Sequence, residues 1–175
     1  TIGWTIRQWC SSRSDRSDRL SCLRDTGGVS LSPYYDTWVT SPLHGSASGK
    51  VLLTSLTDEE RRARLGPGPY EPQTSHTIAD PALLQADLEA SLERGYVVAR
   101  DDAFVGLTAL GAPITQNGDA IGCFFVFGRS TNFDDAKTER TGQALSRAAE
   151  LFSHGTPSLK AVSDLLGPRP AAIGS

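Results

Sequence analysis

With 175 residues, 38% of them apolar and 21% charged, the chain is long enough for one globular domain with a sizeable core and is unlike a disordered protein. The net charge is −3 and basic residues are interleaved with acidic ones, so the basic face of a DNA-binding domain is not evident. The sequence shows neither an apolar run of membrane-spanning length nor a signal peptide, and we expect a cytoplasmic protein.

The cysteines are Cys10, Cys22 and Cys123, an odd number without the spacing of a zinc site or a disulfide framework. We therefore expect free thiols, no metal site and no cofactor. Residues 3–12 are rich in β-formers and predict a first strand. Residues 20–24 predict a second strand. The first two cysteines would face each other only if these strands form a hairpin.

Residues 12–19 read Ser-Arg-Ser-Asp-Arg-Ser-Asp-Arg, and their balanced charge predicts a solvated hairpin loop between these strands. Residues 30–38 then contain Tyr34, Tyr35 and Trp38 within five positions. Large aromatic side chains of this kind either cover a pocket or a dimer seam, or simply pack as a loop over the core. Both readings stay open.

The central stretch is residues 42–56, in which an X-Pro pair and five small residues precede an apolar run. It predicts a helix that begins near Gly45–Ser46. The first N–H groups of a helix lack intrahelical partners and can hold an anion, although small residues here also allow close packing on a sheet. Lys50 lies in the first turn, where the helix dipole disfavours a cation; we expect it to be solvated, with a carboxylate partner as the alternative. His44 is expected to be structural.

The middle of the chain shows clear helix boundaries. Thr57-Asp58-Glu59-Glu60 is a capping box, and the arginines that follow it predict a solvated face that ends at Gly66. These are Arg61, Arg62 and Arg64. Asp80-Pro81 predicts the start of a second helix, which ends at Gly95 and has Leu84, Leu88 and Leu92 along one stripe.

The last part of the chain predicts strands and one long helix. Residues 96–100 predict a strand, and Asp101–Asp102 behind it a solvated turn. Residues 106–115 and 120–128 predict a hairpin closed by an Asn-Gly turn. In its second arm Phe125 and Phe127 share one face. Asp134 is expected to cap the final helix. Its core stripe is predicted to be Ala144, Leu145, Ala148, Ala149 and Phe152.

An ordered set of motifs resembles the effector-binding domain of IclR-type (isocitrate lyase regulator) bacterial transcription factors. The motifs are "PLHGSASGKVLL", "TDEERRARL", "LERGYVV", "GLTALGAPI" and "AIGCFFVFG", within about residues 31–153. The resemblance implies a GAF-like α/β (α+β) domain with a central, mostly antiparallel sheet and helices packed on it. It implies a domain over residues 1–153, a short helix and mobile tail over residues 154–175, and a winged helix-turn-helix outside this chain. The chain starts at Thr1 and contains no methionine, so we expect a fragment or a processed product.

The resemblance also implies an effector site. Backbone N–H groups of Ala47, Ser48 and Gly49 would receive an effector carboxylate. Four positions that are polar in the family, an acid, a cysteine and two serines, fall here on apolar residues. These are Ala99, Ala109, Phe125 and Phe127. The aromatic segment often helps to wall the pocket in the family, which usually has smaller residues there; this adds Tyr34 and Trp38.

Two functions follow from this substitution pattern. A hydrophilic acid needs several polar partners, so an effector here should be a small organic acid that is flatter and more apolar. Alternatively Phe125 and Phe127 fill the cavity, and the domain is a ligand-free dimerisation module. The family implies a homodimer or homotetramer that contacts DNA only through the absent N-terminal domain. An enzyme is not expected, because residues 45–49 lack the Gly-x-Ser-x-Gly nucleophile elbow.

Overall fold

A computed structural model describes residues 2–6, 19–21, 40–116 and 118–155. The strands are β1 (Ile2–Ile6), β2 (Arg19–Ser21), β3 (Thr40–Pro42), β4 (Val97–Arg100), β5 (Leu107–Gln116) and β6 (Asp119–Arg129). The α-helices are α1 (Ala47–Thr54), α2 (Asp58–Leu65), α3 (Pro81–Arg94) and α4 (Asp135–Gly155), and η2 (Leu43–Gly45) and η3 (Ser130–Asn132) are 3-10 turns. The boundaries predicted from caps and turns therefore hold for α1, α2, α3 and the β5–β6 hairpin.

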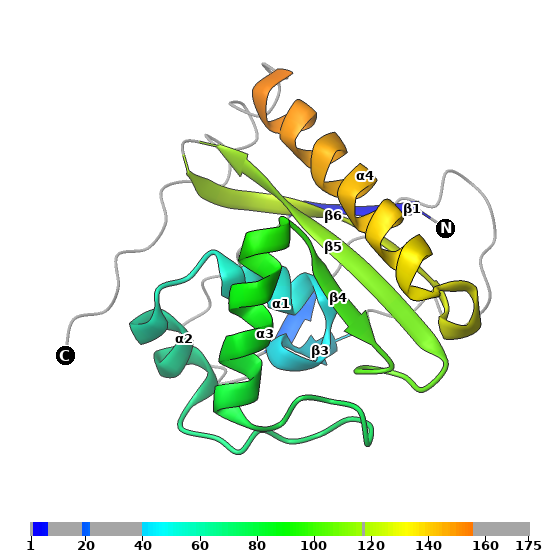
Figure 1. Cartoon of the computed structure of the whole chain (residues 1–175). Coiled ribbons are helices and arrows are strands. Elements are labelled where there is room, and N and C mark those ends of the chain that lie inside the picture. Colours follow the sequence, from blue (N-terminus) through cyan, green and yellow to red (C-terminus); the bar gives the residue numbers. More distant parts are fainter. Residues whose placement is uncertain (1, 7–18, 22–39, 117, 156–175) are drawn as a thin grey trace.

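A four-stranded sheet in the order β1-β6-β5-β4 forms the centre of the fold, and each neighbouring pair is antiparallel (Figure 1). The long hairpin of β5 and β6 supplies the two inner strands. This confirms the predicted α/β fold with a central antiparallel sheet. β2 and β3 form a separate antiparallel pair.

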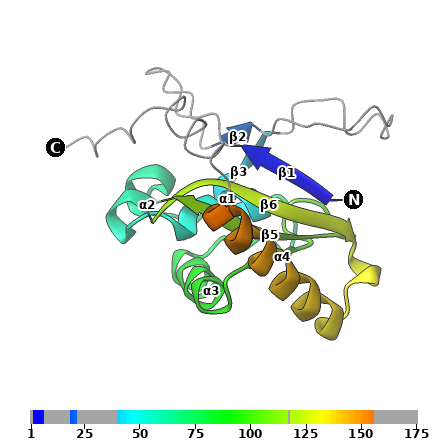
Figure 2. The same ribbon diagram turned by 90° about the horizontal axis from the view of Figure 1, so that it is seen from above.

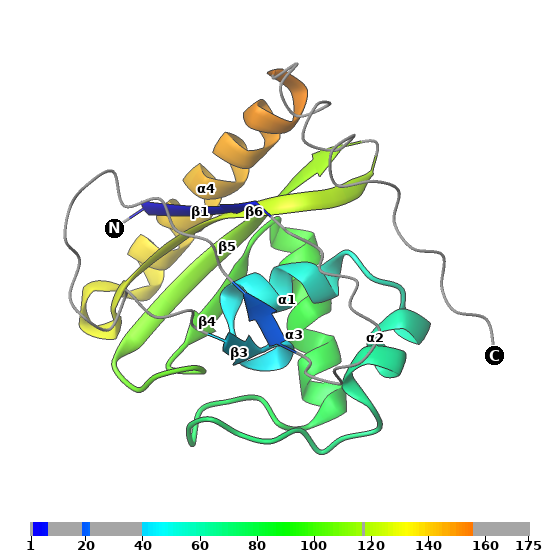
Figure 3. The same cartoon turned by 180° about the vertical axis from the view of Figure 1, so that it is seen from behind.

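The two faces of the sheet are covered by different helices (Figures 1 and 3). α4 packs on one face, where its residues Leu145 and Ala149 join Leu110, Ala112 and Ile114 of β5 in one cluster. α1 packs on the other face through Ala47 and Val51. The β2–β3 pair lies on the same side as α1, away from α4 (Figure 2). The alternation of side chains along β5 and β6 therefore separates two cores, as expected for a strand buried on both faces.

α3 and α2 complete the side of the domain that α1 occupies. Leu84 and Leu88 of α3 are almost fully buried against Leu52, Leu53 and Leu56 at the end of α1. The side chain of Asp80 accepts hydrogen bonds from the second and third residues of α3, and Gly95 ends the helix in the left-handed region at φ 79°. These local signals place α3 firmly, because each satisfies backbone groups that the helix itself leaves unpaired.

The structure corrects several predictions. The first two strands do not pair with each other: β1 pairs with β6 and β2 with β3. The loop at residues 12–18 and the thiols of Cys10 and Cys22 lie outside the described residues. In α4, Leu145 and Ala149 are buried as predicted, but Ala144, Ala148 and Phe152 are exposed. Thr138 and Gly142 take buried positions on the inner side instead, because the stripe that faces the sheet runs along i, i+4, i+7 and i+11.

Candidate functional site

The start of α1 is fixed by its cap. Ser46 is the N-cap residue, and its side-chain oxygen accepts a hydrogen bond from the N–H of Gly49 at 3.2 Å. Gly49 must lack a side chain, because a Cβ at this position would collide with the backbone of Leu43. The small residues at the start of α1 therefore permit close packing against Leu43. The N–H of Gly49 is already hydrogen-bonded to the side chain of Ser46. Ala47 is buried and Ser48 half-buried in the first turn.

The four apolar positions assigned to the effector site lie together on the α1-facing side of the sheet. Ala99 of β4 is paired with Ala109 of β5, which is paired with Phe127 of β6, so the three form one row across the strands. Phe125 lies in the same apolar cluster as Ala47, Ala99 and Ala109. The structure thus brings Ala47 of α1 and the assigned residues of β4, β5 and β6 to the same side of the sheet, where Ala47 and Ala99 are buried.

Two aromatic rings form the part of this surface that β6 provides. Phe125 and Phe127 stack with their ring centroids 6.0 Å apart and their planes inclined by 22°. Both side chains are half-buried. Tyr34 and Trp38, the other aromatic residues assigned to the site, lie outside the described residues. We name the set Ala47, Ala99, Ala109, Phe125 and Phe127 the effector patch.

A buried cluster of charged side chains lies beside α1. Lys50 of α1 is 1% exposed, and its Nζ atom lies 2.9 Å from a carboxylate oxygen of Asp87 in α3 and 2.6 Å from one of Asp102. Arg94 lies 3.7 Å from the other oxygen of Asp87. The prediction of a solvated lysine is wrong, and so is that of a solvated turn for Asp102, which is 5% exposed. A lysine this far from water is retained only with charged partners.

The two neighbouring aspartates differ in their surroundings. Burial raises the pKa of Asp102 above its ordinary value; Lys50 opposes this rise, whereas Asp87 and Asp101 add to it. For Asp101 a hydrogen bond from the Ser130 hydroxyl is the main cause of a lowered pKa. Thr77 stabilises the turn that contains Asp101 and Asp102, because its hydroxyl donates to the carbonyl of Asp102 at 2.6 Å. The cluster therefore fastens α1 to α3 and to the β4–β5 turn.

The histidine and the first serine of the segment before α1 have structural partners. Nε2 of His44 lies 3.0 Å from the carbonyl oxygen of Glu71, and its ring packs on Tyr70. The Ser46 hydroxyl donates to the carbonyl of Pro42 at the end of β3 and accepts from the N–H of Gly49 in α1. Among the described residues no group of three or more His, Cys, Asp or Glu side chains is arranged to hold a metal ion. Within that same part of the chain, no helix combines the length and apolar character needed to span a membrane.

Sequence reasoning missed the partners of Lys50. The signal that could have found them is the cation in the first turn of a helix, which is unfavourable without a counter-charge. The burial of Arg61 was also missed. This residue was predicted to lie on a solvated helix face, but it is 9% exposed. Its guanidinium donates to the carbonyl of Leu53 at the end of α1 at 3.0 Å.

Comparison with known proteins identifies the domain. Residues 38–154 match the family model described as "Bacterial transcriptional regulator IclR C-terminal". The HTH-type transcriptional regulator BhcR of Paracoccus denitrificans is 29% identical over 123 residues, covering 70% of this chain and 44% of that protein. The HTH-type transcriptional repressor AllR of Escherichia coli K12 is 28% identical over 113 residues, covering 64% and 42%. The chain thus spans less than half the length of these relatives.

Solved structures share the fold at lower identity. The IclR protein of Thermotoga maritima superposes with a TM-score of 0.70 at 23% identity, covering 87% of this chain and 59% of that one. An IclR homologue of Microbacterium hydrocarbonoxydans, in complex with 4-hydroxybenzoate, has a TM-score of 0.66 at 19% identity, with 89% and 61% covered. The inducer-binding domain of PobR from Acinetobacter, a double mutant in complex with 3-hydroxybenzoic acid, has a TM-score of 0.65 at 18% identity, with 86% of each chain covered.

Proposed function

The chain belongs to the IclR family of bacterial transcriptional regulators through its C-terminal domain, and on that premise we propose that it senses a small organic acid on behalf of a DNA-binding regulator. DNA contact is then the task of a winged helix-turn-helix outside the 175 residues, in keeping with the net charge of −3. The regulator acts as a homodimer or homotetramer in the cytoplasm.

We place the effector on the effector patch and at the first turn of α1, near Ser48. Ala99, Ala109 and Phe127 offer no polar atom beyond the backbone along their row, so a hydrophilic acid would lose water there without gaining partners. A flat ring would instead lie against Phe125 and Phe127, where stacking of aromatic planes is favourable. The carboxylate would then face the start of α1, whose dipole favours an anion.

The observation that carries this proposal is the packing of α1 on the side of the sheet that holds the Ala99–Ala109–Phe127 row. Two proteins that share the fold support the ligand class, since their structures contain 3-hydroxybenzoic acid and 4-hydroxybenzoate. The proposed effector is therefore an aromatic or similarly apolar carboxylic acid rather than a small keto acid.

A second function rests on the same two rings. If Phe125 and Phe127 occupy the space of the ligand, the domain serves assembly of the regulator and senses nothing. The stacking of the rings on each other, with Phe125 in the apolar cluster, favours this alternative.

A thermal-shift screen separates the two functions. The panel contains 3-hydroxybenzoate, 4-hydroxybenzoate and benzoate, with pyruvate and glyoxylate as hydrophilic acids. A ligand that binds only the native state at a hundredfold excess over its Kd adds about 2.7 kcal/mol to the free energy of unfolding, which raises Tm measurably. A shift with the aromatic acids alone supports the sensor; a folded, oligomeric chain that no acid shifts supports the assembly module.

A further inference from the structure

The turn between β4 and β5, residues 101–106, is held in place by several hydrogen bonds. The carboxylate of Asp101 accepts the N–H of Gly106 at 2.6 Å and the hydroxyl of Ser130 at 2.7 Å. The hydroxyl of Thr74 donates to the carbonyl of Asp101 at 2.7 Å. Asp101 has a φ of 63°, in the left-handed region that residues other than glycine rarely adopt. The surrounding contacts therefore fix the backbone of this turn.

Two large apolar side chains project from the turn. Phe104 is 56% exposed and Val105 is 72% exposed. Turns at the surface usually contain small or polar residues, so a phenylalanine and a valine side by side are unusual here. Because the backbone that carries them is already ordered, a partner that covers them loses little affinity to the ordering of a loop. Exposed apolar residues on a fixed backbone have the properties of an interface anchor.

The start of β1 lies at the same end of the sheet as this turn. Ile2 pairs with Val126 of β6, and Val126 pairs with Leu110 of β5. Leu110 in turn pairs with Val98 of β4, which is two residues from the end of that strand. Three strand spacings of about 4.8 Å place β1 about 14 Å from β4. A segment that precedes β1 therefore enters the domain at the end of the sheet where the turn lies (Figures 1 and 3).

The size of the apolar surface indicates what kind of partner it fits. A free protein partner needs a total buried surface of about 1,200 Å² or more, and two side chains supply at most a few hundred Å². A domain tethered by a short linker is present at an effective concentration of about 1 mM, so a far weaker contact keeps it docked. The surface is therefore suited to a tethered domain rather than to a second copy of the chain.

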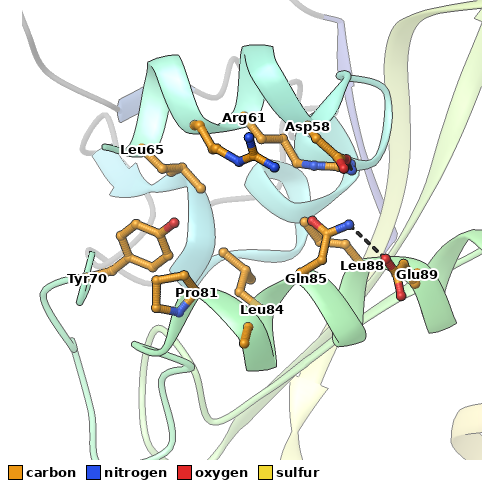
Figure 4. A pocket seen from close by; sticks show the side chains of 11 residues that line it. Asp58, Arg61, Leu65, Tyr70, Pro81, Leu84, Gln85, Leu88 and Glu89 are labelled. Carbon is orange, nitrogen blue, oxygen red and sulfur yellow. Dashed lines mark hydrogen bonds and ion pairs between the residues drawn. The ribbon is translucent and has the colours of Figure 1, made fainter. Parts of the chain in front are cut away.

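The hollow between α2 and α3 is less suited to this task. It has a volume of about 360 Å³, and its apolar lining includes Leu65, Leu84 and Leu88 (Figure 4). These three leucines are buried or half-buried within the domain. No residue of the β4–β5 turn lines the hollow. The hollow thus lacks the projecting apolar side chains that the turn offers.

We propose that the β4–β5 turn is the surface on which the DNA-binding domain of the same regulator docks, with Phe104 and Val105 as the anchors. The inference rests on the proposed function, in which a winged helix-turn-helix precedes this C-terminal domain. The turn is also joined to α1, because Nζ of Lys50 lies 2.6 Å from the carboxylate of Asp102. Docking would thus connect the DNA-binding domain to the helix at which the effector carboxylate is proposed to bind.

The test is hydrogen–deuterium exchange, followed by mass spectrometry, of the full-length regulator and of the 175-residue chain. We expect the amides of residues 101–106 to exchange at least about threefold more slowly in the full-length regulator, because the docked domain shields the turn. The segments of α2 and α3 that line the hollow should exchange equally in the two proteins.

Two full-length variants localise the contact. Phe104→Ser/Val105→Ser should exchange at the turn as fast as the 175-residue chain with the same substitutions. Leu151 is 75% exposed near the end of α4, where Ser153 contacts Thr115 at the far end of β5 from the turn, so Leu151→Ser should keep the slow exchange. Exchange in β5 and β6 as in the wild type shows that each variant is folded.

Three results would each overturn the proposal: equal exchange of the turn in the two wild-type proteins, protection of the hollow instead of the turn, or loss of the protection in Leu151→Ser. Protection of the turn that grows with the concentration of the 175-residue chain alone would assign the turn to contacts between copies, and would overturn it too. No acid is added in these measurements, so they do not depend on whether the effector patch binds an effector.

Discussion

Phe125 and Phe127 stack on each other on the α1-facing side of β6, with their ring centroids 6.0 Å apart. Phe127 stands opposite Ala109 across the ladder, and Ala109 stands opposite Ala99. Two large rings thus lie next to two of the smallest side chains. This contrast of size is suited to a flat ligand whose ring lies on the phenylalanines and whose edge extends over the alanines.

Replacement of Phe127 by Ser is expected to increase the affinity for pyruvate. The variant adds a hydroxyl donor and removes a ring from the effector patch, and a hydrogen bond to a charged group contributes about 1.5–3 kcal/mol, or roughly tenfold or more in affinity. Isothermal titration calorimetry measures the change. The control is Phe104→Ser, at an exposed residue of the β4–β5 turn, which should leave pyruvate binding as in the wild type. If Phe127→Ser gains nothing, position 127 does not contact the effector.

Gly49→Ala is expected to destabilise the domain although alanine favours helices. The added Cβ would meet the backbone of Leu43, including its carbonyl oxygen, and backbone atoms cannot move aside as a flexible side chain does. Overpacking of this kind costs about 1–3 kcal/mol in the free energy of unfolding, measured by urea denaturation. Ser48→Ala, one residue earlier on the half-buried side of the same turn, should change stability by much less. Equal stability of Gly49→Ala and the wild type would mean that η2 and α1 are packed less closely than the structure shows.

Lys50→Met is expected to lower the free energy of unfolding by about 3–5 kcal/mol, because it leaves the buried carboxylate of Asp102 without its cation and removes one of the two cations beside the half-buried Asp87. The double variant Lys50→Met/Asp102→Asn removes one of these charges and should recover part of the loss. Urea denaturation of the two variants gives the comparison. A double variant less stable than Lys50→Met would contradict this account of the cluster.

Asp101 and Asp102 are expected to affect stability in opposite directions as the pH changes. The folded-state pKa of Asp102 is raised, so between the ordinary carboxyl value near about 4 and the raised value the native state binds more protons than the unfolded state. Its contribution to the free energy of unfolding therefore falls as the pH rises through that window. The folded-state pKa of Asp101 is lowered, so its contribution is present above about pH 4 and is lost as the pH falls below it.

Denaturation of wild type, Asp102→Asn and Asp101→Asn from pH 3 to pH 7 measures both trends. The stability of the wild type minus that of Asp102→Asn should decrease as the pH rises above about 4. The same difference for Asp101→Asn should change below about pH 4 and increase with pH. Parallel curves for the two variants would show that the two carboxyls do not have the different environments described above.

The helix and strand boundaries could be predicted from the sequence wherever neighbouring residues determine them. The capping box at Thr57, the Asp80-Pro81 helix start, Gly95 and the Asn-Gly turn each satisfy or release backbone groups within a few residues, and the structure shows all four boundaries. Alternation along residues 124–127 also correctly placed Phe125 and Phe124 on different faces, since they belong to separate clusters.

What sequence reasoning got wrong depends on contacts between distant segments. The first-turn position of Lys50 indicates a carboxylate partner, but no local signal identifies Asp87 and Asp102, which converge on it from α3 and from the turn after β4. Arg61 has the sequence context of a solvated helix face, and only the packing of α2 against the end of α1 buries it. The pairing of β1 with β6 likewise joins two segments that are far apart in the sequence. The positions of the effector patch came from the family resemblance, and their role in binding remains a prediction.

The most direct test of the sensor function is isothermal titration calorimetry of 4-hydroxybenzoate with the wild type, with Ser48→Phe and with Ala90→Phe. Ser48 lies in the first turn of α1, where the carboxylate is proposed to bind, whereas Ala90 is exposed on α3. We predict binding to the wild type and to Ala90→Phe, and an affinity at least about tenfold lower for Ser48→Phe. Binding that Ser48→Phe leaves unchanged would contradict the proposed site, and a folded wild type that binds no aromatic acid would contradict the proposed function.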